Sequence, residues 1–206
     1  MVYISTHPLV MHKISQIRDR NTSNFDFRRT MKELAILLGY EVMSSFPTKD
    51  IKVKTPLSTA DCKVLAKDIV IVAILRAGLS LMEGLLEIIP HAKQAHIGIY
   101  RDEETLKPVK YYLRFPDDLK KSQVIVVDPM LATGGSAVEA INIVKSRGAK
   151  NINFMSVIAA KYGIDFLRKH HPDIKIFTGA MDEKINNNGY IVPGLGDAGD
   201  RMFGTD

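Results

Sequence analysis

The sequence predicts an α/β protein with a largely parallel sheet flanked by helices. Two short apolar runs carry this prediction, IVIVAIL at Ile69 to Leu75 and VIVV at Val124 to Val127. Continuous β-branched runs of this length are typical of strands that are buried on both faces of a parallel sheet. Each run is followed by a turn that contains glycine and then by a stretch with helical periodicity. Repeated units of strand, turn and helix indicate parallel strands joined by helical crossovers.

The composition suits one globular domain over residues 1–206. Hydrophobic residues make up 46% of the chain, which is enough for a sizeable core. The formal net charge of +5 is compatible with a polyanionic substrate, but without a Lys/Arg run we expect no nucleic-acid partner. Cys62 is the only cysteine, which excludes an intrachain disulfide and a cysteine metal cluster. Without a membrane-spanning run or a signal-peptide pattern, we expect a soluble cytoplasmic protein that binds no membrane.

The first quarter of the chain is expected to contain helices and one half-exposed strand. Residues 1–25 are polar and irregular apart from a short helix at Leu9 to Arg18. A longer helix is predicted from Phe27 to Phe46, since apolar residues recur on one of its faces. Residues 51–55 alternate between apolar and basic types, as in an edge strand outside the main sheet. This segment, about residues 1–60, carries no obvious chemistry and suits either a subunit interface or a flap over the core.

The rest of the chain continues the alternation of strands and helices. The predicted helices cover Ser80 to Ile89, the stretch after Ser136 that Gly148 ends, and Ile164 to His170. The predicted strands cover Ala95 to Tyr100, Val109 to Leu113, Ile152 to Ala159, and Ile174 to Thr178. A charged segment joins the first two of these strands, which predicts a long hairpin arm over about residues 95–115.

The strand at 124–127 leads into the motif DPMLATGGS, residues 128–136. Glycines let the backbone turn tightly and bring its N–H groups close to an anion, and the following helix adds the positive end of its dipole. TGGS alone is also a common strand-to-helix turn. An acid at the carboxyl end of the strand, Asp128, makes a ligand site more specific, because ligands bind at that edge of a parallel sheet. The motif lacks the lysine of a Walker loop and the glycine spacing of a dinucleotide fingerprint.

This motif resembles the phosphoribosyl-diphosphate (PRPP) loop of type I phosphoribosyltransferases, in the form carried by the uracil phosphoribosyltransferases. Three further stretches resemble the same family in the same order: ILRAGL at 74–79, YRDEET at 100–105, and GYIVPGLGDAGDRMFGT at 189–205. The last is the most diagnostic, because the base-recognition element separates one phosphoribosyltransferase from another. We expect it to be an ordered loop within a uracil-binding hood over residues 180–206. The resemblance runs from about Leu75 to the C-terminus and is only an outline before that.

The resemblance implies the reaction of uracil with PRPP to give UMP and diphosphate, in pyrimidine salvage. It implies Mg²⁺ carried by the diphosphate, with no direct protein ligand and with a water-mediated link to Asp197. It also implies a non-proline cis peptide near Arg76-Ala77, an arm that closes over the site, a homodimer or homotetramer, and GTP or CTP as effectors. The residues that it assigns to PRPP are Arg76, Arg101, Asp128, Pro129, Met130, Leu131, Ala132, Thr133, Gly134, Gly135, Ser136 and Asp197. Those that it assigns to uracil are Ile191, Gly196, Asp197 and Ala198.

In this scheme Arg76, Arg101 and Asp197 are the catalytic residues. The two arginines would neutralise the departing diphosphate, and Asp128 would accept hydrogen bonds from the ribose hydroxyls. Many type I enzymes carry a second acid where this chain has Pro129, and an aspartate where it has Ala132. The usual base for uracil N1 is therefore missing, and Asp197 either takes that proton or only organises Mg²⁺ and water.

Two other functions stay open at this point. One is a pyrimidine-responsive RNA-binding regulator on the same fold, although the sequence has no basic stripe with interleaved aromatics. The other is a phosphoribosyltransferase for another base, although the C-terminal motif disfavours the larger purine ring. Lys161-Tyr162 stands where the family usually has Pro-Glu, and we assign it no role.

Overall fold

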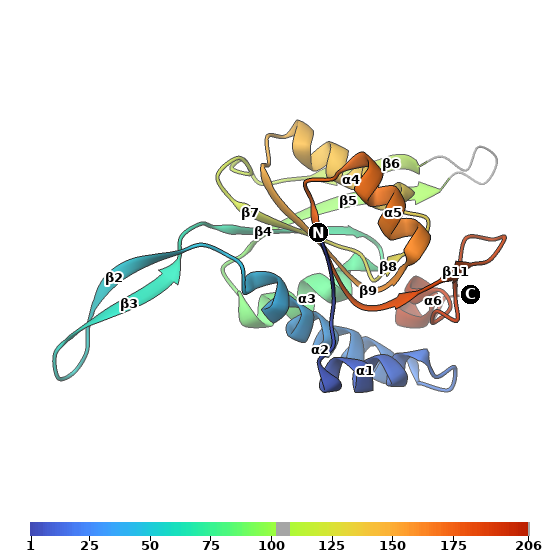
Figure 1. Cartoon of the computed structure of the whole chain (residues 1–206), viewed down its shortest axis with the longest axis horizontal. Helices are drawn as coiled ribbons and strands as arrows, with labels where there is room; N and C mark the ends of the chain where they lie inside the picture. Colours follow the sequence, from blue (N-terminus) through green and yellow to red (C-terminus); the bar gives the residue numbers. More distant parts are fainter. Residues whose placement is uncertain (102–107, 206) are drawn as a thin grey trace.

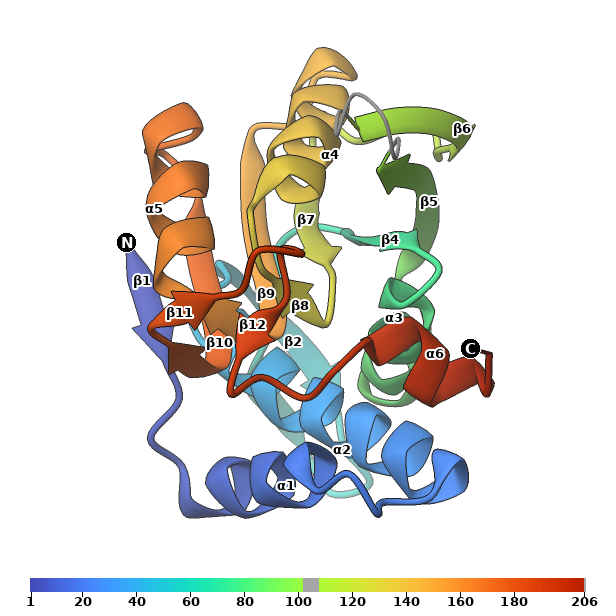
Figure 2. The ribbon, with the colours of Figure 1, turned by 90° about the vertical axis from the view of Figure 1, so that its right-hand side faces the viewer.

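The structure is a computed structural model that describes residues 1–101 and 108–205. Its centre is an eight-stranded sheet with helices on both faces (Figures 1 and 2). The path through the sheet is β1 (Val2–Ile4), β10 (Lys175–Asp182), β9 (Asn151–Ala160), β7 (Gln123–Val127), β4 (Ile69–Leu75), β5 (Lys93–Arg101) and β6 (Pro108–Arg114), with β8 (Met130–Leu131) beside β9. Every neighbouring pair is parallel except β5 and β6. This arrangement confirms the predicted α/β class.

Six helices and two small antiparallel ribbons complete the described chain. The helices are α1 (Pro8–Arg18), α2 (Asn24–Met43), α3 (Gly78–Ile88), α4 (Gly135–Ser146), α5 (Lys161–His170) and α6 (Ala198–Phe203). The ribbons pair β2 (Thr48–Lys54) with β3 (Thr59–Leu65) and β11 (Lys184–Ile185) with β12 (Ile191–Val192). Along the described residues, no helix is both long enough and apolar enough to cross a membrane.

The central strands are buried on both faces, as their continuous apolar sequences predict. Along β4, Ile69, Ile71 and Ala73 belong to the core layer that includes α2 and α3. The alternate residues Val70 and Val72 belong to the layer that includes α4 and α5. The two layers are the direct result of the period of two along a strand. These two core layers hold the sheet between the helices. The packing on both faces restricts movement of the strands, and therefore of the strand ends relative to one another.

Helix α2 covers one face of the sheet rather than standing apart from it. Phe27, Met31 and Leu34 on its inner face are fully buried. The helix begins three residues earlier than predicted, because the Ser23 hydroxyl accepts a hydrogen bond from the Asp26 N–H and caps it. It ends at Met43, before the predicted end at Phe46.

Four features were not predicted correctly. Residues 1–25 are more regular than expected, since β1 adds to the sheet beside β10 through backbone hydrogen bonds. Strand β3 was missed because its residues are mostly exposed and because Ala60, Cys62 and Val64 give only a weak apolar alternation. The C-terminal motif contains a helix, α6, where a loop was expected. The non-proline cis peptide is Leu75–Arg76, one residue before the expected place, since the resemblance located the loop but not the bond.

The β2–β3 hairpin projects away from the rest of the molecule (Figure 1). Its two strands pair with each other and form a separate two-stranded sheet. Leu57 at its tip is 97% exposed. An isolated two-stranded hairpin is only marginally stable in water. Unlike the main sheet, this hairpin is not stabilised by further paired strands among the described residues.

Candidate active site

Parallel pairing brings the ends of three strands to one edge of the sheet. Strand β4 pairs in parallel with β7 on one side and with β5 on the other. Arg76 follows β4, Asp128 follows β7, and Arg101 is the last residue of β5. The predicted convergence of these positions is therefore present in the backbone. The side chain of Arg101 and residues 102–107 of the predicted arm lie outside the described residues.

Strand β9 anchors the predicted PRPP loop through backbone hydrogen bonds. The Pro129 carbonyl accepts hydrogen bonds from the N–H groups of Val157 and Ile158, at 3.0 and 3.1 Å. Leu131 is 1% exposed and packs in the core beside α4 and α5. These residues anchor the loop through side chain and backbone, so a ligand would meet the residues after them.

Glycines shape the turn from the loop into α4. Gly134 is the N-cap with φ of 86°, a left-handed conformation that glycine adopts without strain. A Cβ there would lie 3.0 Å from the Gly163 carbonyl oxygen. A Cβ on Gly135 would meet only the Thr133 hydroxyl, at 4.0 Å, so that position faces open space. No side chain caps α4, and its first N–H groups are available to an anion.

Helix α5 packs against the backbone of the same loop. A Cβ on Gly163 would overlap the carbonyl oxygens of Ala132 and Leu131. Glycine at this position therefore lets α5 approach the loop backbone closely. Gly163 was not predicted as a site residue, because a lone glycine in a helix does not reveal which residues it contacts.

Asp128 lies at the carboxyl end of β7, half-buried. Its carboxylate accepts a long hydrogen bond from the Met130 N–H, at 3.4 Å. Burial away from water raises the pKa of the Asp128 carboxyl group to about 7, and the negative charge of Asp197 adds to the rise. The hydrogen bond from Met130 opposes it.

The C-terminal motif combines buried apolar residues with exposed positions that include Gly196 and Asp197. Ile191 and Ala198 are 4% exposed, and their side chains pack in the core. Gly196 is exposed, with φ of 82°. Asp197 is also exposed, and its carboxylate caps α6 by accepting a hydrogen bond from the Asp200 N–H at 3.0 Å. This cap explains why the motif contains a short helix.

Arg76 contacts α6 in this structure. Its guanidinium lies 3.9 Å from an Asp200 carboxylate oxygen and 5.3 Å from the centre of the Phe203 ring. The Arg76 side chain is 56% exposed, so this ion pair is weak. An arriving diphosphate would meet an arginine that is already close to the C-terminal motif.

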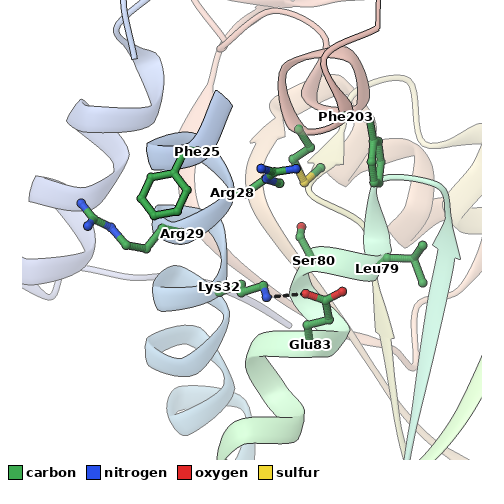
Figure 3. Close-up of a pocket in the computed structure, with 9 residues that line it drawn as sticks. Phe25, Arg28, Arg29, Lys32, Leu79, Ser80, Glu83 and Phe203 are labelled. Atoms are coloured by element: carbon green, nitrogen blue, oxygen red, sulfur yellow. Dashed lines mark ion pairs between the residues drawn. The ribbon is translucent and has the colours of Figure 1, made fainter. Parts of the chain in front are cut away.

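A cavity of about 490 Å³ lies beside the site, between α2, α3 and α6 (Figure 3). Lys32 and Glu83 form an ion pair in it, and Phe203 closes its α6 side. The cavity shares Phe203 with the environment of Arg76. Leu79, Met202 and Phe203 belong to the quoted motifs, and the other lining residues were not selected from the sequence. The full lining consists of Phe25, Arg28, Arg29, Lys32, Leu79, Ser80, Glu83, Met202 and Phe203.

Three further residues connect the C-terminal motif to the rest of the protein and were missed. Arg18 pairs with Asp182, and Arg201 bonds to backbone carbonyls near the end of α1. Arg18 and Asp182 are 164 residues apart, so no local pattern reveals their contact. Arg201 belongs to the quoted motif, and its place there was the one available signal.

Comparison with known proteins places these features in a family. The family model described as uracil phosphoribosyltransferase matches residues 4–205. A uracil phosphoribosyltransferase from Dictyoglomus thermophilum is 56% identical over 206 residues, covering all of both chains. One from Bacillus velezensis is 55% identical over 205 residues, covering 99% of this chain and 98% of the relative.

Solved structures agree with this placement. A protein from Aquifex aeolicus superposes with a TM-score of 0.94 at 39% identity, covering 98% of each chain. The adenine phosphoribosyltransferase from Leishmania donovani has a TM-score of 0.59 at 15% identity, covering 91% of this chain and 86% of its own, which shows the shared fold alone. From the loop geometry, the C-terminal motif and these matches together, the chain belongs to the uracil phosphoribosyltransferase family.

Proposed function

We propose that this protein transfers the phosphoribosyl group of PRPP to N1 of uracil, giving UMP and diphosphate. One observation carries the proposal: Arg76, in the stretch assigned to the diphosphate, lies 3.9 Å from Asp200 and 5.3 Å from the ring centre of Phe203 in the C-terminal motif. This contact supports a single site that is shared by the proposed base-reading element and the proposed diphosphate-binding turn. Family membership supports the choice of uracil as the base.

The proposed PRPP site uses the backbone more than side chains. The N–H groups at the start of α4, with the hydroxyls of Thr133 and Ser136, bind the 5′-phosphate. Asp128 accepts hydrogen bonds from the ribose hydroxyls. Its raised pKa favours a ligand that brings donors or positive charge, since either stabilises the ionised carboxylate.

The chemical step breaks the bond between C1′ and the diphosphate oxygen early and gives an oxocarbenium-like transition state. Negative charge grows on the leaving group as this bond lengthens. Arg76 and Arg101 neutralise that charge, which is the main catalytic contribution. The predicted arm over 95–115 excludes water, because the activated ribose is easily hydrolysed.

Uracil is recognised through the backbone of Ile191, Gly196 and Ala198. The flat ring offers alternating carbonyl and N–H groups, which exposed backbone groups match. Ile191 and Ala198 pack in the hydrophobic core, so in this proposal they contribute their main chain and not their side chains. Asp197 lies between the base and PRPP and either accepts the N1 proton or orders water.

Magnesium enters this proposal with PRPP. Within residues 1–101 and 108–205, no group of three or more His, Cys, Asp or Glu residues is arranged to hold a metal ion. Asp128 and Asp197 nevertheless suit a hydrated cation that arrives with PRPP, since Mg²⁺ keeps several waters and uses few protein oxygens. Asp197 would contact it through water, and the ion would supply charge neutralisation for the diphosphate.

The test is turnover of uracil with PRPP and Mg²⁺ to UMP, with cytosine, hypoxanthine and orotate as competing bases. We expect UMP from uracil alone and no activity after chelation of the metal. No product from any base, with PRPP still bound, would favour an RNA-binding regulator instead. The Asp197→Asn variant keeps the cap of α6, because the amide oxygen still accepts from Asp200. Near-normal turnover by that variant would exclude Asp197 as a required base.

Oligomeric assembly and regulation belong to the same proposal. We propose a homodimer or homotetramer in the cytoplasm, with GTP or CTP as effectors, on the basis of the resemblance to the family. Sedimentation measures the assembly. Initial rates with and without each nucleotide, at PRPP concentrations below its KM, measure the regulation.

A further inference from the structure

An arginine and an aspartate from distant parts of the chain form a bidentate ion pair that contacts the C-terminal motif. Arg18 is the last residue of α1, and Asp182 is the last residue of β10. The guanidinium donates to both carboxylate oxygens, Nη1 to Oδ2 at 2.8 Å and Nη2 to Oδ1 at 2.7 Å. The Asp182 side chain is only 8% exposed, so its charge depends on this partner.

The same pair holds the backbone of Gly194 from both sides. Arg18 Nη1 also donates to the Gly194 carbonyl, at 2.7 Å. The Gly194 N–H donates to Asp182 Oδ2, at 3.0 Å. The three residues thus form a closed ring of hydrogen bonds. Gly194 has φ of 58°, and a Cβ on it would overlap the Ile191 carbonyl, so the ring depends on glycine here.

A second arginine holds the next residue against the same helix end. Arg201 Nη1 donates to the carbonyls of Leu195, at 2.8 Å, and of Ile17. Its Nη2 donates to the Asp19 carbonyl at 2.7 Å, and the guanidinium stacks over the Phe27 ring, 4.3 Å from its centre. Gly194 and Leu195, the two residues that precede Gly196, are therefore both attached to the C-terminal end of α1.

We propose that Arg18 and Asp182 are positioning residues for uracil: they fix the backbone that presents Gly196 and Ala198 to the base. This inference rests on the proposed role of those two residues. The PRPP loop rests instead on β9 and α5, through Pro129 and Gly163. A disturbance of the Arg18–Asp182 pair should therefore reach uracil binding and spare PRPP binding.

Asp182→Asn is the most selective change. It keeps the size of the side chain and one acceptor oxygen, but it removes the negative charge and the second oxygen of the bidentate pair with the guanidinium. We expect KM for uracil to rise about tenfold or more, because small shifts of a positioning element are costly. KM for PRPP should stay within about twofold of the wild-type value, and kcat should fall less than uracil KM rises.

Arg18→Lys and Arg18→Met provide a graded series. Lysine keeps the charge but cannot make the bidentate contact and also reach Gly194. Its KM for uracil should lie between those of the wild type and of Arg18→Met. Hydrogen exchange should rise in a peptide that covers residues 190–198 and stay constant in one that covers 128–136.

Lys13→Met is the matched control. Lys13 lies on the same helix and pairs with Glu33 of α2, away from the C-terminal motif. It should leave both KM values unchanged. An equal rise in KM for uracil and for PRPP in Asp182→Asn, or unchanged KM for uracil despite a lower Tm, would overturn the positioning role.

Gly196→Ala distinguishes the two ways to fail. At φ of 82° the added methyl strains the backbone that is proposed to read the base. If this variant also leaves KM for uracil unchanged, the base site itself is misplaced and the inference fails with it. If Gly196→Ala raises KM for uracil and Asp182→Asn does not, only the positioning role is overturned.

Discussion

Asp128 meets two opposing requirements, accessibility to a ligand and burial in the folded protein. As the proposed ribose ligand it has to be accessible, yet its burial at the end of β7 removes water from the carboxyl group. The result is a pKa of about 7 rather than 3.8. The sequence identified this residue from its place after a buried strand. It could not reveal the raised pKa, which depends first on burial in the folded protein and to a smaller extent on Asp197, some 70 residues later in the chain.

The raised pKa predicts a pH-dependent cost to folding. Between about pH 4 and pH 7 the folded protein keeps a proton on Asp128 that the unfolded chain has released, so stability from this group falls as pH rises through that window. Asp128→Asn removes the effect. We expect the variant to be more stable than the wild type by about 2–4 kcal/mol at pH 8, and the difference to vanish near pH 4. Urea unfolding of both proteins at several pH values measures it, and a difference that is independent of pH would contradict it.

Adjacent glycines in the PRPP loop have different tasks. Gly134 needs its left-handed backbone, so Gly134→Ala should destabilise the fold by about 1–2 kcal/mol. Gly135→Ala places a methyl group in the open space before α4. We expect it to leave Tm nearly unchanged and to raise KM for PRPP at least about tenfold, because the methyl would occupy phosphate space. Thermal unfolding and initial rates separate the two, and a Gly135→Ala variant with normal KM for PRPP would place the phosphate elsewhere.

At the scale of elements, the buried strands were predictable and the short ones were not. Strand β4 begins and ends at the predicted residues, because an apolar run bounded by polar residues specifies it directly. Helix α6 has six residues, and its limits are set by the Asp197 cap and by Gly204 with φ of 66°. In the sequence these residues looked like a glycine-rich loop, since so short a helix shows no periodicity.

The contact of α5 with the PRPP loop gives a prediction against the usual rule. Replacing a helical glycine with alanine normally stabilises a helix by about 0.5–1 kcal/mol. Gly163→Ala should instead destabilise by about 1–3 kcal/mol, because its Cβ would overlap the carbonyls of Ala132 and Leu131. KM for PRPP should rise as the loop shifts.

Gly84→Ala is the control for this experiment. Its Cβ would approach the Lys32 carbonyl and the Ala35 Cβ, where α3 packs on α2. It should lower Tm by a similar amount without raising KM for PRPP. Equal effects of the two variants on KM would mean that α5 acts through overall stability alone.

At the scale of the whole molecule, the β2–β3 hairpin is the feature that one chain leaves unexplained. Val53 and Val64 lie on one face of it, and both are more than a third exposed. We expect a second copy of the chain to cover this face, because an uncovered two-stranded ribbon with an apolar face is unfavourable in water. The sequence predicted the first strand and a role at an interface or as a flap, but not the projection.

Sedimentation velocity tests this expectation at micromolar protein. The wild type should sediment as a dimer or larger, and the double variant Val53→Glu/Val64→Glu should dissociate. Lys54→Glu changes the net charge by the same two units on the opposite face and should leave the assembly intact. A monomeric wild type would contradict the expectation outright.

The hydrogen bonds that attach the C-terminal motif to the end of α1 affect the order in which the protein folds. The PRPP loop, β9 and α5 lie close together along the chain. The base site instead requires contacts between residues 164 positions apart, in Arg18 and Asp182, and 184 apart, in Arg201 and Ile17. Contacts that close such long loops form late. A refolding chain should therefore regain the ability to hold PRPP first and the ability to choose a base last.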